Sequence, residues 1–162
     1  MTIKELLVQI KQLTASIFGL RKELRKKNEE MVICVCKEKG LSLAQGMEIR
    51  ATVFAESQFD STAYRDNNDG AFLAKNYPVE YQKYVQQTGR FNSRDAGICQ
   101  FNDFWWYYYK GNKRIHPNIA QNDPETAVRI MIDAYRNGEI KAWHGYKSKL
   151  FYDYYKKFSG VI

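Results

Sequence analysis

The sequence predicts an α+β fold that is predominantly α-helical, with one small β-hairpin region and an N-terminal heptad helix. Apolar residues recur at helical spacing in several segments, which capping and turn residues separate. Residues 60–70 change abruptly to Asp, Asn, Ser and Gly, and residues 91–102 have the character of extended chain. The 162 residues, 44% apolar and 27% charged, suit one domain with a single core, or a small domain plus an appendage, and exclude a disordered chain.

The N-terminal segment carries an apolar stripe with alternating spacings of three and four residues, which is a heptad pattern. The stripe consists of Ile3, Leu6, Ile10, Leu13, Ile17, Leu20 and Leu24. We expect its helix to end near Asn28, which divides the chain into an N-terminal helix, residues 1–28, and a main domain, residues 29–162. Two roles are open for the stripe: self-association or partner docking through residues 3–24, or packing on the main domain.

Helix signals order the first part of the main domain. A second helix is expected from about residue 29 to Lys39, because Gly40 is a typical C-terminal stop. Ser42 and Gln45 form a capping-box pattern that starts a third helix. That helix fades near Glu56, where its apolar stripe ends.

The second half of the chain predicts a short helix, an aromatic helical turn, a long amphipathic helix and a C-terminal helix. These segments cover residues 78–88, 104–109, 124–137 and 148–158 in that order. Pro78 and Gly89 bracket the short helix, and Asp123 with Pro124 opens the long one, which Gly138 ends.

The composition points to an anionic polymer as partner. The formal net charge is +7, and aromatic residues make up 15% of the chain, with 12 Tyr, 9 Phe and 3 Trp. A basic, aromatic-rich surface suits a nucleic acid, a membrane face or an acidic polysaccharide. Composition alone does not choose among these three.

The cysteines predict neither a disulfide framework nor a metal site, and no cofactor is expected. Three is an odd count, and Cys34 and Cys36 would lie roughly 200° apart around a helix. No apolar run approaches the ~20 residues of a membrane span. Lys4, Glu5 and Lys11 interrupt any apolar signal-peptide core, so no export signal is legible.

Glu56 is the candidate catalytic residue that the residues themselves indicate. It follows the apolar sequence Val53-Phe54-Ala55 at the expected end of a helix. Partial desolvation there would raise the pKa of its carboxyl group, because the charged form loses water. A raised pKa is what a general acid needs near neutral pH. The alternative is an exposed glutamate at a helix end.

The neighbouring sequence resembles the active-site region of the lysozyme superfamily, and of the c-type lysozymes in particular. The residues that carry the resemblance are Glu56-Ser57-Gln58-Phe59, Asn67-Asn68-Asp69-Gly70, Asp95-Ala96-Gly97-Ile98-Cys99-Gln100-Phe101-Asn102 and Trp105-Trp106. The resemblance covers residues 30–147 loosely and about 30 positions tightly. It implies a lysozyme-like fold and cleavage of the β-1,4 bond between N-acetylmuramic acid and N-acetylglucosamine in peptidoglycan.

The resemblance also implies roles for individual residues. Glu56 would be the general acid, and Asp95 the nucleophile or ion stabiliser. The substrate-binding residues would be Ser57, Gln100, Asn102, Trp105, Trp106 and Trp143. Trp143 would close the cleft opposite the acid, or would be an ordinary core residue. His116 and His144 are candidate bases, but nothing pairs them with a nucleophile, so surface or capping roles are favoured for both.

Three departures from the family pattern bear on mechanism and origin. About 22 residues, 71–92, are inserted before the Asp95 motif, position 96 is Ala rather than an aromatic residue, and the animal disulfide framework is absent. The missing disulfides suggest a bacterial or phage relative. If the insertion displaced Asp95 from the cleft, the expected chemistry would be that of a lytic transglycosylase, which works with a single Glu such as Glu56.

Two other functional classes are weighed against an enzyme. A glycan-binding module could keep the cleft and lose catalysis, although the intact Glu56 and Asp95 argue against this. A nucleic-acid binder could use the +7 charge and the aromatic segment 105–109, which fits better as a cleft-lining helix. Peptidoglycan strands are the favoured partner, with no nucleic acid and no membrane span, and the expected place of action is extracellular or at the cell wall.

Overall fold

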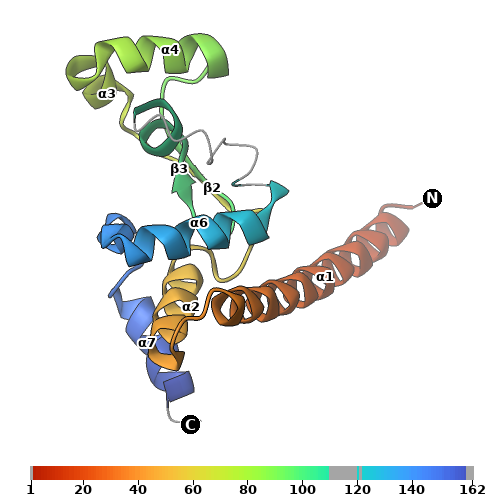
Figure 1. The fold of residues 1–162 in the computed structure, drawn as a ribbon. Coiled ribbons are helices and arrows are strands. Elements are labelled where there is room, and N and C mark those ends of the chain that lie inside the picture. The colour runs from red at the N-terminus through yellow and green to blue at the C-terminus, as the bar shows by residue number, and fades with distance from the viewer. Residues whose placement is uncertain (1, 110–119, 121, 160–162) are drawn as a thin grey trace.

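The computed structural model describes residues 2–109, 120 and 122–159, and it is mostly helical with a small three-stranded antiparallel sheet. The prediction of a predominantly helical α+β fold is confirmed. Figure 1 shows a helical body below, the sheet in the middle and a pair of helices above it. None of the described helices combines the length and apolar character needed to cross a bilayer.

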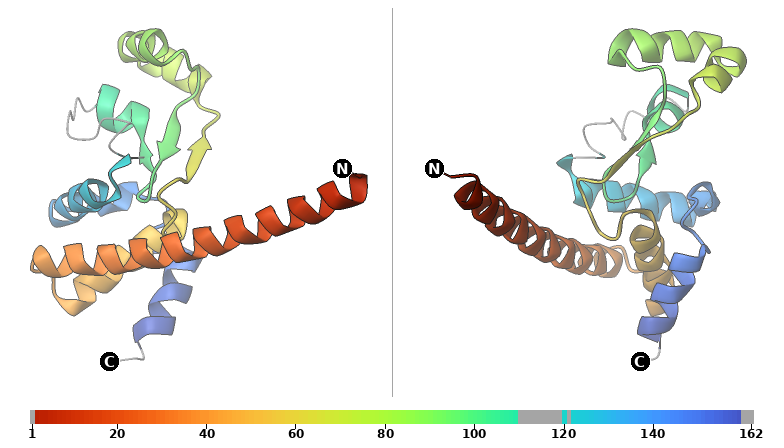
Figure 2. Two further views of the ribbon diagram at one scale, coloured as in Figure 1. Left: turned by 90° about the vertical axis from the view of Figure 1, so that its right-hand side faces the viewer. Right: turned by 180° about the vertical axis from the view of Figure 1, so that it is seen from behind.

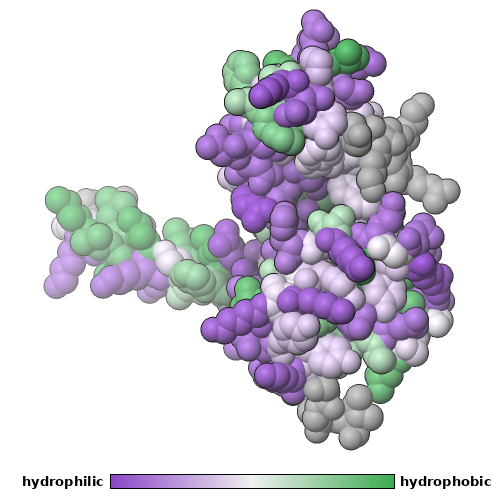
Figure 3. Space-filling view, turned by 90° about the vertical axis from the view of Figure 1, so that its left-hand side faces the viewer, coloured by the Kyte–Doolittle hydropathy of each residue, from purple (hydrophilic) through white to green (hydrophobic). Residues whose placement is uncertain are grey.

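The first helix, α1 (Ile3–Glu38), is continuous, so the predicted break near Asn28 is wrong. What changes at Asn28 is burial: it is the first buried residue of α1, and its side-chain amide donates to the Phe59 carbonyl at 2.7 Å. From there, Val32 and Val35 face the core. The part of α1 before residue 25 is exposed and extends away from the body (Figure 2). Apolar side chains gather along it (Figure 3).

The helical body holds the main core. Besides the second half of α1 it consists of α2 (Leu43–Ser57), α6 (Pro124–Arg136), the short η3 (Glu139–Ala142) and α7 (Lys149–Ser159). Helix α2 packs against α7 and α1, and α1 packs against α6. The largest fully buried side chains of this core are Val32, Val35, Ile49, Val53, Ile98, Phe101, Met131 and Ile132.

The predicted helix caps are present. Ser42 and Gln45 exchange both capping-box hydrogen bonds, at 3.3 and 2.9 Å, and Asp123 accepts from the Thr126 N–H at 2.9 Å. Helix α2 ends where Gln58 takes a left-handed backbone conformation, with φ +53°. The boundaries predicted for the helices of the second half agree with α6 and α7 to within a residue or two.

The sheet has three strands rather than the expected hairpin: β1 (Tyr64–Asp66), β2 (Arg94–Ala96) and β3 (Phe101–Asn102). Strand β2 is central, with Arg65 opposite Asp95 on one side and Asn102 opposite Asp95 on the other. The π-helical turn η1 (Phe104–Tyr109) follows β3. The sequence also predicts that this aromatic turn ends at Gly111, a residue outside the described ones.

The insertion folds into the upper helix pair, α3 (Gly70–Asn76) and α4 (Pro78–Thr88). Helix α4 has the predicted bounds, whereas α3 was not predicted. The pair has a small core of its own, with Leu73 and Tyr84 packed against Phe104 of η1. The helix pair connects the end of β1 to the start of β2. The two strands therefore remain paired, and Asp95 stays in the sheet.

A buried charge cluster ties the insertion to the sheet. Asp103, whose side chain is 2% exposed, forms an ion pair with Arg90 and accepts the Arg94 N–H at 2.8 Å. The Tyr84 hydroxyl lies 2.7 Å from the Asn92 carbonyl and 3.3 Å from the Asp103 carboxylate. Burial, with the Asp103 charge, raises the pKa of Tyr84 to about 12.

Candidate active site

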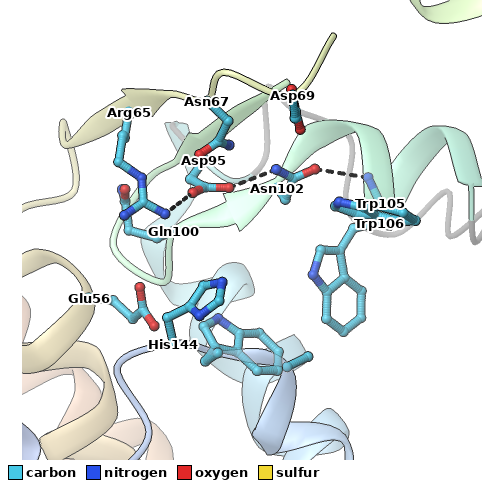
Figure 4. A pocket seen from close by; sticks show the side chains of 12 residues that line it. Glu56, Arg65, Asn67, Asp69, Asp95, Gln100, Asn102, Trp105, Trp106 and His144 are labelled. Atoms are coloured by element: carbon cyan, nitrogen blue, oxygen red, sulfur yellow. Dashed lines mark hydrogen bonds and ion pairs between the residues drawn. The ribbon is translucent and has the colours of Figure 1, made fainter. Parts of the chain in front are cut away.

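A cleft of about 460 Å³ lies between the helical body and the sheet (Figure 4). It gathers residues from α2, all three strands, η1 and the segment after α6. Its lining residues are Glu56, Arg65, Asn67, Asp69, Asp95, Gln100, Asn102, Trp105, Trp106, Ala142, Trp143 and His144. Seven of the eight predicted site residues are therefore in one cavity.

Glu56 enters the cleft from the last turn of α2 and is half-buried. Its Oε1 accepts the backbone N–H of Gly145 at 2.5 Å. Burial raises the pKa of Glu56, and the nearby Asp95 charge adds to the rise. The Gly145 N–H, the Arg65 guanidinium and His144 act against it without reversing the direction. A raised pKa keeps a larger share of the carboxyl protonated near neutral pH, as a general acid requires.

Asp95 is buried in the central strand, and both of its oxygens accept hydrogen bonds. Arg65 Nη2 donates to Oδ2 at 2.5 Å, and Asn102 Nδ2 donates to Oδ1 at 2.8 Å. The two donors are the residues directly opposite Asp95 on β1 and β3, so the strand register itself creates this arrangement. The insertion therefore does not displace Asp95 from the cleft.

A network of polar side chains continues from Asp95 along the upper wall of the cleft. Asn102 Nδ2 also donates to Ser93 Oγ at 2.8 Å, and Ser93 donates to Asp69 through both its hydroxyl, at 2.5 Å, and its backbone N–H, at 2.9 Å. Asn67 Nδ2 donates to the Ser93 hydroxyl at 3.2 Å. This wall is pre-organised, because its side chains hold one another in place.

Gln100 lies at the turn between β2 and β3, where its backbone is left-handed with φ +48°. Its side-chain amide donates to the carbonyls of Ala63 and Gly97, at 3.0 and 2.9 Å. These bonds fix the turn against the end of the segment before β1. Gln100 is thus placed in the cleft, as predicted, with its amide nitrogen engaged by the protein.

The three tryptophans also line the cleft. Trp105 packs edge-on against Tyr77, with 5.0 Å between ring centroids, and Trp106 packs edge-on against Phe101 at 5.3 Å. Trp143 is 4% exposed and donates its indole N–H to the Cys99 carbonyl at 2.7 Å. Trp143 is therefore a core residue that also lines the cleft.

Ser57 is the predicted substrate-binding residue that the structure leaves out of this cleft. Its buried hydroxyl donates to the Ile98 carbonyl at 2.7 Å. The bond ties the end of α2 to the segment between β2 and β3. Ser57 therefore positions the elements that carry Glu56 and Asp95.

Two residues without a predicted role, Arg65 and Gly145, bond to the candidate catalytic carboxylates. His144, expected at the surface or in a cap, is exposed and lines the cleft beside Glu56. Only the register of β1 against β2 could reveal Arg65, and only the folded chain brings Gly145 to Glu56. His116 lies outside the described residues.

The described residues hold no group of three or more His, Cys, Asp or Glu side chains that could bind a metal ion. Their cysteines are all free thiols: Cys36 and Cys99 are buried, and Cys34 is exposed. Burial raises the pKa of Cys36 to about 11, so this thiol is a poor nucleophile.

No protein-family model, no curated protein and no solved structure matches this chain. The site is therefore interpreted through its own chemistry. Glu56, with its raised pKa, can serve as a proton donor, and Asp95 provides a carboxylate. The side chains of Asn67, Asp69 and Asn102 provide hydrogen-bonding groups, and the indole rings provide flat apolar surfaces. Hydrogen-bonding groups together with aromatic faces in one cleft suit a sugar ring, which has polar edges and apolar faces.

Proposed function

We propose that this protein is a peptidoglycan-cleaving muramidase with a lysozyme-like fold, which hydrolyses the β-1,4 bond between N-acetylmuramic acid and N-acetylglucosamine. The observation that carries the proposal is the pairing of Glu56 and Asp95 in one cleft. Glu56 has a raised pKa at the end of an apolar helix, and Asp95 accepts hydrogen bonds from Arg65 and Asn102. Glycosidic cleavage uses one carboxyl group as acid and one carboxylate beside the developing positive charge.

In this mechanism the protonated Glu56 donates its proton to the glycosidic oxygen as the bond to C1 of N-acetylmuramic acid breaks. Asp95 stabilises the oxocarbenium-like charge at C1 or bonds to it. A water molecule, deprotonated by Glu56, then adds to C1 and restores the carboxyl group. Asn102 and the tryptophans hold the sugars in register.

The composition supports the choice of polymer. Bacterial walls carry anionic groups, and the +7 charge would raise the rate at which the protein meets them. The place of action that we propose is accordingly the cell wall, outside the cytoplasm, for a protein of bacterial or phage origin.

A second candidate is a lytic transglycosylase that uses Glu56 alone. The observation in its favour is that both Asp95 oxygens are occupied, one of them by the Arg65 guanidinium at 2.5 Å. A carboxylate so paired offers less charge to an oxocarbenium ion. The substrate's own N-acetyl group would then stabilise C1, and an anhydro sugar would form in place of the hydrolysis product.

The test is lysis of purified peptidoglycan by the wild type and by Glu56→Gln, with the products analysed by mass spectrometry. We expect Glu56→Gln to lose about 10²–10⁴-fold in rate, the usual contribution of a general acid. Products one water lighter than hydrolytic muropeptides would establish the transglycosylase. Unchanged lysis by Glu56→Gln would contradict both enzymes.

Glu48→Gln is the matched control. Glu48 lies on the same helix, is also half-buried, and accepts the Tyr135 hydroxyl at 2.7 Å outside the cleft. This variant should lyse the wall at the wild-type rate. Binding to the wall without any released sugar, by the wild type, would favour a catalytically inactive glycan-binding module instead.

A further inference from the structure

The exposed part of α1 carries an apolar face that no described part of the chain covers. Its seven heptad residues are between 38% and 79% exposed: Ile3, Leu6, Ile10, Leu13, Ile17, Leu20 and Leu24, here called the seam. The space-filling view shows this apolar surface on the segment that extends from the body (Figure 3). Exposed apolar area of this extent marks an interaction surface.

The order of side chains along the seam specifies its partner. With Ile3 at position a of the heptad, the first three a positions, 3, 10 and 17, are Ile, and the d positions, 6, 13 and 20, are Leu. Leu24 occupies the fourth a position. Branched Ile at a with Leu at d favours two parallel strands, because each side chain then fits the hole of the facing helix. We propose that the seam forms a parallel two-stranded coiled coil with a second copy of this chain.

The residues that flank the seam are compatible with this pairing. In a parallel pair, a residue at position g faces position e of the next heptad on the other copy. Gln9 then faces Thr14, and Ser16 faces Arg21. Neither pair brings like charges together, so nothing along the flanks opposes the dimer.

Hydrogen bonds hold both ends of the exposed part of α1. Thr2 and Glu5 close a capping box at its free end, and Asn28 fixes the helix to the body at the other end of the exposed part. Figure 2 shows this part reaching well beyond the body, which leaves room for a second helix beside it. At a rise of 1.5 Å per residue, the seam is about 33 Å long. Most helical stability in proteins comes from packing of an apolar face, so packing against a copy would stabilise this exposed segment.

An anionic membrane surface is the competing occupant, because Lys4, Lys11 and Lys22 lie off the seam. A membrane requires only an apolar face and a basic face. It does not require strict alternation of three and four, nor Ile and Leu in separate positions. The seam from Ile3 to Leu20 has both features, and only Leu24 at its end departs from the second, which favours a copy of the chain.

The experiment is sedimentation equilibrium of the full chain and of two exposed-site variants. Leu13 is a seam residue, 64% exposed, and Phe18 is an off-seam residue, 67% exposed. We expect twice the 19.0 kDa monomer mass for the wild type and for Phe18→Asp, and the monomer mass for Leu13→Asp. Far-ultraviolet circular dichroism shows whether each variant keeps its helices.

Orientation is tested by Leu6→Cys in a Cys34→Ser background, since Cys34 is the exposed native thiol. Air oxidation should give a covalent dimer, because parallel strands bring the two copies of residue 6 face to face. A wild type that is monomeric at every accessible concentration overturns the proposal. So does equal loss of binding to phosphatidylserine vesicles by Leu13→Asp and Phe18→Asp in a monomeric chain, which would assign the face to a membrane surface. The sedimentation mass, the disulfide cross-link and the vesicle binding are all measured without reference to the proposed lytic activity.

Discussion

Gly145 donates its backbone N–H to Oε1 of Glu56 at 2.5 Å, across 89 residues of sequence. The approach is so close that a Cβ atom on Gly145 would lie 2.8 Å from that oxygen and 3.0 Å from the Ala55 Cβ. Position 145 therefore accepts only glycine while Glu56 keeps its place. The bond orients the carboxyl group that we propose as the general acid.

Gly145→Ala should accordingly displace the Glu56 carboxyl group. Because a shift of about 1 Å in a catalytic group can cost about 10²-fold, we expect a loss of lytic rate of that order. The measurement is the turnover rate on purified peptidoglycan at saturating substrate.

Gly46→Ala is the control for this variant. Gly46 lies on α2, and a Cβ there would meet only the Cys36 Cβ, at an ordinary 3.6 Å. This variant should keep the wild-type rate, and Ala should slightly favour the helix. Equal rates for both alanine variants would contradict the positioning role of Gly145.

The stability of the protein should respond to pH through Glu56. Its pKa is raised in the fold, so the folded state holds the proton more tightly than the unfolded chain does. The stability contributed by the neutral carboxyl is full at acid pH. It is lost as the pH rises from the ordinary glutamate range through the raised pKa.

Glu56→Gln removes this dependence, because an amide has no charge to desolvate. We therefore expect the melting temperature of Glu56→Gln, relative to the wild type, to increase from pH 4 to pH 8. Calorimetry at several pH values measures the difference. A difference that stays constant, or that falls with pH, would contradict the raised pKa.

Local signals made much of the fold predictable. Ser42 with Gln45, and Asp123 with Pro124, mark helix starts through contacts within four residues, and the structure keeps them. The break predicted near Asn28 failed because burial, rather than helix propensity, changes there. Asn28 resembles a helix terminus in the sequence because its hydrogen-bond acceptor, the Phe59 carbonyl, is distant along the chain.

The residues of the candidate site likewise fall into those that the sequence predicted and those that it did not. Glu56 and Asp95 were predicted from motifs, whereas Arg65 and Gly145 depend on contacts that no local pattern contains. Strand β1 pairs with a segment about 30 residues later, and the inserted helices between them hide that pairing from a linear inspection. Ser57 is part of the motif, but its side chain has a structural role, because its hydroxyl donates a hydrogen bond to the Ile98 carbonyl.

Arg65 and Asp95 should tune the acid in opposite directions. The Arg65 guanidinium lowers the pKa of Glu56 and the Asp95 charge raises it. Arg65→Gln should therefore move the pKa of Glu56 upward, and Asp95→Asn should move it downward. A ¹³C NMR titration of the Glu56 carboxyl reads both directly, whatever the residual activity. Shifts of the same sign would contradict the geometry of the cleft.

Asp95→Asn also separates the two proposed mechanisms. If Asp95 stabilises the charge at C1, its amide variant should lose most of the lytic rate. If Glu56 works alone, the rate should change little and the products should remain anhydro sugars. Mass spectrometry of the products, beside the rate, decides between a hydrolase and a transglycosylase.

The last prediction concerns the charge cluster beneath the insertion. Arg90→Met keeps an apolar stem beside Tyr84 but leaves the buried Asp103 carboxylate without its cation. Removing one partner of a buried ion pair typically costs about 3 kcal/mol in the free energy of unfolding. Urea denaturation at neutral pH measures this loss. Burial already raises the pKa of Asp103, and removal of Arg90 raises it further, so the loss should shrink as the pH falls and the carboxyl is protonated.

Two variants isolate the buried charge as the cause. Arg129→Met removes an exposed pairing with Glu125 and Glu38, and it should leave the unfolding midpoint unchanged, because water screens such pairs. Adding Asp103→Asn to Arg90→Met removes the unpaired charge and should recover part of the lost stability, since the two sites are coupled. If the double variant is less stable than Arg90→Met, hydrogen bonding by the Asp103 carboxylate, rather than its pairing with Arg90, holds the insertion on the sheet.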